Sequence, residues 1–95
     1  MELHEAYLER RQAELDEADA ELKTFEFKAD NVPPDEQVQF YEDLQALRAQ
    51  YAKTRHKLGE LREAGSQSRS KIQQELEIAW KDLQNGMQRA SQSLK

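Results

Sequence analysis

The sequence predicts an all-α protein in which an antiparallel helical hairpin (a coiled coil) is followed by a C-terminal amphipathic helix. Apolar residues recur in alternating steps of three and four, the spacing that keeps a coiled-coil stripe on one side of a helix. Two adjacent prolines, Pro33 and Pro34, interrupt this pattern, and a stretch of serine and glycine interrupts it again. We expect one domain over residues 1–95, built as a three-helix or dimeric helical bundle.

The first helix is expected over residues 2–29. Glu2 and Glu5 lie in its first turn and Lys23 and Lys28 near its end, which is the order that the helix dipole favours. Heptad spacing places its apolar side chains on a single stripe, which predicts a packed face. This first seam consists of Leu8, Leu15, Ala18, Leu22, Phe25, Ala29 and Val32.

The second helix, over residues 34–64, should run antiparallel to the first because the connection is short. Proline suits the first helical position, and Asp35 and Glu36 follow Pro34 in that turn. Two registers of the hairpin remain open, in which the numbers of facing residues add up to 69 or to 62. The seam of this helix consists of Phe40, Leu44, Leu47, Tyr51, Thr54, Leu58 and Leu61.

The third helix is expected over residues 69–94, and its apolar stripe is out of phase with the second seam. Gly65 and the serines around it form helix poorly, which favours a break at this point. The alternative is one long helix that continues through a stutter in the heptad pattern. The third stripe consists of Ile72, Leu76, Ala79, Trp80, Leu83, Met87, Ala90 and Leu94.

Composition and charge exclude several classes of function. The net charge is −5, and residues 1–32 alone carry ten acids against four bases, so nucleic acid is not an expected partner. Cysteine is absent, which excludes disulfides and thiolate metal sites. No apolar run is long enough for a membrane-spanning helix, and the acidic start does not resemble a secretory signal. We expect a cytoplasmic protein.

The candidate chemical groups do not form a catalytic, cofactor or metal site. Neither His4 nor His56 has a glutamate three residues before it, so the Glu-x-x-His pattern of di-iron bundles is missing. The acids between Glu14 and Glu21 lie on a helix without the turn glycine of a calcium loop. We therefore expect no cofactor, no metal and no enzymatic activity.

Charged residues at or beside the seams predict contacts between helices. Arg11 occupies a d position, where it could specify register, although extension of its guanidinium to water is the favoured interpretation. Four bases of the second helix are candidates to lie alongside the acids between Glu14 and Glu21 or beside Glu9, namely Arg48, Lys53, Arg55 and Lys57.

The third stripe is the main candidate for an interface. It either covers the open side of the hairpin or pairs with a second copy, and we expect a homodimer or another protein partner. The runner-up function is binding to a membrane or lipid surface through residues 72–94, where Lys71, Lys81 and Arg89 flank the stripe. The interface candidates are Leu76, Trp80, Leu83 and Met87, with Phe27 and Tyr41 off the seams.

Two stretches carry a resemblance to a known family. They are Lys57-Leu58-Gly59-Glu60-Leu61-Arg62-Glu63-Ala64-Gly65 and Ala79-Trp80-Lys81-Asp82-Leu83-Gln84-Asn85-Gly86. With the acidic first helix, the sequence resembles small bacterial coiled-coil proteins labelled stress-response or apolipoprotein-like coiled-coil proteins. The resemblance implies a helical bundle and a link to stress response, and it implies no catalytic or ligand-binding residues. A non-catalytic structural or protein-interaction role is the function that we expect.

Overall fold

The computed structural model describes residues 3–93, which form three long α-helices and one short 3-10 turn without any strand. Helix α1 spans Leu3–Lys28, the 3-10 turn η1 spans Ala29–Asn31, α2 spans Pro34–Glu63 and α3 spans Arg69–Ser93. The all-α prediction is confirmed. The expected helix ends at residues 2 and 94 lie outside the described residues.

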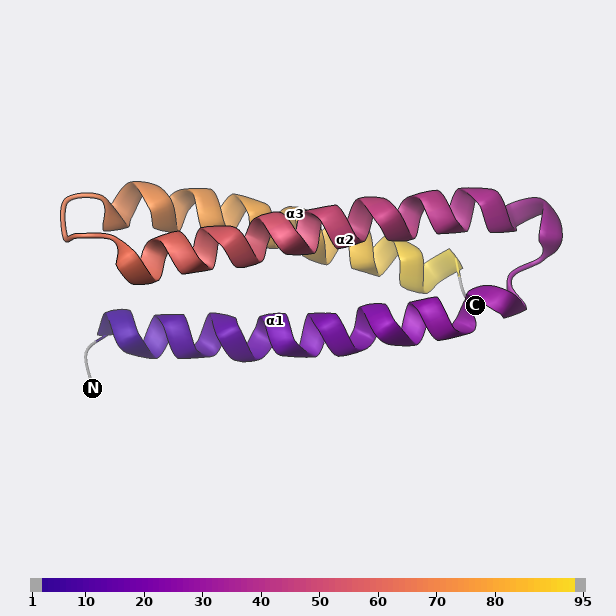
Figure 1. Cartoon of the computed structure of the whole chain (residues 1–95), viewed down its shortest axis with the longest axis horizontal. Helices are drawn as coiled ribbons and strands as arrows, with labels where there is room; N and C mark the ends of the chain where they lie inside the picture. Colours follow the sequence, from indigo (N-terminus) through magenta and orange to yellow (C-terminus); the bar gives the residue numbers. More distant parts are fainter. Residues whose placement is uncertain (1–2, 94–95) are drawn as a thin grey trace.

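The helices run up, down and up along a molecule of 50 × 21 × 16 Å (Figure 1). Helix α2 packs against both of the others, whereas α1 and α3 contact each other least. In the view of Figure 1, α3 crosses α2 obliquely, and its C-terminal end lies at the same end of the molecule as the α1–α2 connection. The third helix therefore folds back over the hairpin within one chain.

The connection between α1 and α2 follows from the two prolines. Val32 and Pro33 have extended backbone with ψ values of 137° and 143°, as expected for residues that precede proline. The Val32 amide donates a hydrogen bond to the Ala29 carbonyl at 3.2 Å, and the Glu36 amide donates to the Pro33 carbonyl at 2.8 Å. Ala29 and Val32 are both buried, so the turn closes one end of the core.

The predicted break between the second and third helices is confirmed, and a continuous helix with a stutter is wrong. Helix α2 ends at Glu63, Ala64 is extended, and the Ser68 amide donates a hydrogen bond to the Gly65 carbonyl at 3.0 Å. The chain then reverses direction. Glycine and serine have low helix propensity, so leaving the helical conformation here costs little free energy.

Polar contacts between α1 and α2 decide the register of the hairpin. Arg48 donates hydrogen bonds to Asp19 at 2.9 Å and to Glu26 at 2.6 Å, and Arg62 donates to Gln12 at 2.8 Å. The numbers of these paired residues add up to 67, 74 and 74, which are all closer to the register of 69 than to that of 62.

The predicted seams supply one continuous core. Residues from all three helices meet in it, and Leu15, Leu22, Leu61, Leu76 and Leu83 are each fully buried. Thr54, at a seam position of α2, is also fully buried, and its hydroxyl donates to the Gln50 carbonyl at 2.8 Å. Leu8, Tyr51 and Ile72 pack at the margin of the core and are half-buried.

Candidate functional site

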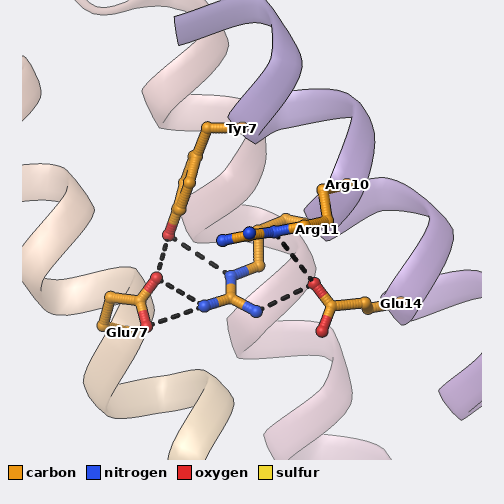
Figure 2. Close-up of polar contacts among 5 residues, drawn as sticks. All are labelled: Tyr7, Arg10, Arg11, Glu14 and Glu77. Atoms are coloured by element: carbon orange, nitrogen blue, oxygen red, sulfur yellow. Dashed lines mark hydrogen bonds and ion pairs between the residues drawn. The ribbon is translucent and has the colours of Figure 1, made fainter. Parts of the chain in front are cut away.

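A group of polar side chains around Arg11 links α1 to α3 (Figure 2). One terminal nitrogen of Arg11 donates to both carboxylate oxygens of Glu77, at 2.6 and 2.8 Å. The other terminal nitrogen donates to Glu14 at 2.9 Å, and Nε donates to the Tyr7 hydroxyl at 3.3 Å. The Tyr7 hydroxyl donates in turn to Glu77. We call these four residues the Arg11 cluster.

Aromatic rings complete the surroundings of the Arg11 guanidinium. Its central carbon lies 5.4 Å from the centre of the Tyr7 ring and 5.3 Å from the centre of the Trp80 ring, within the range of cation–π attraction. Arg11 itself is only 8% exposed. The positive charge of Arg11 therefore lies at the edge of the core, where hydrogen bonds and aromatic rings replace the water that would otherwise solvate it.

The ionisation of the cluster follows from burial and hydrogen bonding. Burial alone would raise the pKa of Glu77, but the hydrogen bonds from Arg11 and Tyr7 outweigh it, and the net pKa is lowered. Burial likewise opposes the charge of Arg11, whereas its bonds to Glu77 and Tyr7 raise its pKa overall. Burial, followed by the bond to Glu77, raises the pKa of Tyr7. The cluster thus combines a neutral Tyr7 phenol with one cation, Arg11, that pairs with the carboxylates of both Glu14 and Glu77.

The favoured sequence interpretation of Arg11, extension of its guanidinium to water, is wrong. The third helix brings Glu77 opposite Arg11, so the guanidinium finds its partners inside the molecule. Sequence reasoning did not find Tyr7 or Glu77. The available signals were that Tyr7 lies one turn before Arg11 on the same side of the helix, and that Glu77 adjoins the stripe residue Leu76.

A second polar group joins α1 to α2 at the surface. Arg48 forms ion pairs with Asp19 and Glu26, and its hydrogen bonds lower the pKa of both carboxyls. The expected placement of Arg48 beside acids of the first helix is confirmed. Lys57 instead lies 3.4 Å from Glu60 of its own helix and 3.6 Å from Glu75 of α3, so the expectation for Lys57 is wrong.

The six interface candidates fall into two groups. Leu76, Trp80, Leu83 and Met87 of α3 are buried against the hairpin of the same chain, with exposures between 0% and 8%. Of the two interpretations of the third stripe, covering the hairpin is the one that the structure shows. In contrast, Phe27 is 85% exposed and Tyr41 is 45% exposed, so these two candidates are not part of the buried group on α3.

Phe27 and Tyr41 lie near the α1–α2 connection together with another exposed apolar residue, Val38. Phe27 is in the last turn of α1, and Val38 is 69% exposed at the start of α2. The Tyr41 hydroxyl is 3.4 Å from a carboxylate oxygen of Asp30. We call Phe27, Val38 and Tyr41 the hairpin-end residues. Their exposure sets these three side chains apart from the buried residues of the core.

The candidate metal ligands are dispersed over the described chain. His56 is exposed and lies 2.9 Å from Glu60, which confirms its predicted surface position, and His4 is half-buried in the first turns of α1. Residues 3–93 contain no group of three histidine, aspartate or glutamate side chains arranged to hold a metal ion.

None of the helices within residues 3–93 has a stretch both long and apolar enough to cross a membrane. Comparisons with family models, with curated proteins and with solved structures found no match to this chain.

Proposed function

We propose that this protein is a non-catalytic helical bundle that acts through contacts with other protein chains, and that its first partner is a second copy of itself. The observation that carries the proposal is the exposure of the hairpin-end residues in a molecule whose core residues are already covered by its own helices. A fold that covers its own seams but leaves Phe27 85% exposed has an apolar side chain available for a partner.

We therefore propose that the dimer contact lies at the end of the hairpin and not on the apolar stripe of α3. Trp80 and Leu83 are 8% and 0% exposed, so they could contact a partner only after α3 had left the core. Phe27 and Val38 require no such rearrangement. Burying two large apolar side chains favours association by about 1.5–3 kcal/mol each, which suits a weak dimer.

Gel filtration with light scattering across the micromolar range tests this proposal. We expect the mass to rise above 11.1 kDa with concentration. The double variant Phe27→Ser/Val38→Ser should weaken the dimer at least about tenfold. Ile78→Ser is the matched control, because Ile78 is 64% exposed on α3 and should leave the dimer unchanged. A mass of 11.1 kDa at every concentration would overturn the dimer.

The membrane-surface alternative ranks second because it needs α3 to detach. The apolar stripe of residues 72–94 that would enter a lipid surface includes Leu76, Leu83 and Met87, all of which are buried in the core. A cytoplasmic location and a link to stress response are also part of the proposal, and the latter rests on the resemblance of the sequence alone.

A further inference from the structure

A groove separates α1 from α3 beyond the Arg11 cluster. The two helices run in the same direction and contact each other least of the three pairs (Figure 1). Between residues 14–21 of α1 and residues 80–92 of α3 lies a groove of about 670 Å³. Its base includes Ala18, Trp80 and Met87, which are each at most 8% exposed. A small side chain at Ala18 contributes to the open space.

The two walls of the groove differ in charge. Glu14, Glu17 and Glu21 line it from α1, whereas Gln84, Gln88 and Gln92 line it from α3. Glu14 is paired with Arg11 at 2.9 Å and lies 3.8 Å from Arg10. Glu17 and Glu21 are exposed and form no ion pair with any residue between positions 3 and 93. The groove therefore has two uncompensated negative charges on one wall and neutral amides on the other.

The spacing of the acids matches a helical partner. Glu17 and Glu21 are four residues apart, so they lie about 6 Å from each other along α1. Lysine or arginine residues at positions i and i+4 of a partner helix have the same separation. The glutamine amides of α3 can both donate and accept hydrogen bonds, so they suit polar side chains on the other flank of such a helix.

We propose that this groove binds a basic helical segment of a partner protein, with its cations toward Glu17 and Glu21. A second copy of this chain is a poorer occupant, since the chain has a net charge of −5 and residues 1–32 are its most acidic part. The inference deepens the proposed function by naming a class of partner and rests on it. It uses residues distinct from the hairpin-end residues, so the dimer and the groove can fail separately.

The test is a titration of the full chain with a fluorescent, alanine-rich peptide of about fifteen residues that carries lysine at every fourth position. At about 0.15 M salt the long-range attraction between charges is screened, and binding then reports close contact. We expect saturable binding that Glu17→Gln/Glu21→Gln weakens about five- to tenfold, since two exposed ion pairs are lost. Gln88→Lys, which puts a cation into the groove from α3, should weaken it as well.

The matched control is Glu5→Gln/Glu9→Gln, which removes the same charge from exposed residues of α1 that do not line the groove. It should change the affinity less than about twofold. Equal losses in the two double variants would show attraction by net charge alone and would overturn the proposal, as would no binding by the unmodified chain. If the groove is not used but the mass still rises with concentration, only the groove is refuted and the proposed dimer stands.

Discussion

The guanidinium of Arg11 and the carboxylate of Glu77 join the first helix to the third through hydrogen bonds of 2.6 and 2.8 Å. The two residues are 66 positions apart in the sequence. Because α1 and α3 otherwise contact each other little, this pair is the main polar link between them. An ion pair with several hydrogen bonds is directional, so we expect it to fix the axial position of α3 relative to α1.

Truncation of Arg11 should destabilise the bundle. In Arg11→Ala, Glu77 and Tyr7 lose a shared partner and the ring of Trp80 loses a neighbour, which should cost about 2 kcal/mol because Glu77 is partly solvated. Arg11→Met keeps an apolar chain of similar length beside Trp80 but leaves Glu77 without its cation, so it should recover only part of that loss. Urea denaturation followed by circular dichroism measures both, and an Arg11→Ala variant as stable as the unmodified protein would contradict this account.

Stability should fall in acid through Glu77. Its folded-state pKa is lowered below the ordinary value of 4.5, so its contribution is present above pH 4.5 and is lost as the pH falls through the folded-state pKa. Asp19 and Glu26, whose pKa values Arg48 lowers, act in the same direction with smaller effect because they face solvent. Thermal melts between pH 7 and pH 3 should show a shallower decline for Glu77→Gln than for the control Glu9→Gln. Identical slopes would refute the role of Glu77.

Gly86 should be the one helical glycine that resists replacement by alanine. A Cβ atom there would lie 2.6 Å from Cδ2 of Leu47, so Leu47 would have to move, whereas a Cβ atom at Gly59 has nothing within 4 Å. Gly59→Ala should stabilise the protein by about 1 kcal/mol through helix propensity. Gly86→Ala should not show this gain, and its free energy of unfolding should be at least about 1 kcal/mol lower than that of Gly59→Ala. Denaturant midpoints of the two variants decide the matter, and equal gains would show that α3 does not approach Leu47 closely.

Much of this fold was predictable because a heptad pattern reports which side of a helix is buried. The seams of α1 and α2, the turn at Pro33 and the break near Gly65 all follow from local residue types. The register required structure, since the two candidates differed by one heptad and placed apolar residues opposite each other in both. The two registers can be distinguished by the acids that Arg48 contacts, and these contacts are known only from the structure.

The site was less predictable than the fold. The stripe of α3 shows that the helix buries one face, but periodicity does not say what covers that face. Leu83 and Trp80 were therefore equally suited to a dimer and to the hairpin of their own chain. The partner of Arg11 depends on the same missing information, because Glu77 becomes its neighbour only when α3 folds back. The exposure of Phe27 agrees with its place off the seam, although its use remains a prediction.

A double-mutant cycle between Arg11 and Glu77 tests most directly whether α3 folds back on α1 of the same chain. The stabilities of Arg11→Met, Glu77→Gln and the combined variant are compared with that of the unmodified protein, at concentrations where it is monomeric. Residues in direct contact should show a coupling of at least about 1 kcal/mol. The control cycle pairs Arg11→Met with Glu75→Gln, which contacts Lys57 instead, and should be additive within about 0.5 kcal/mol. A coupling of about 1 kcal/mol only in the first cycle is the predicted result, and additivity in both cycles would contradict the three-helix arrangement.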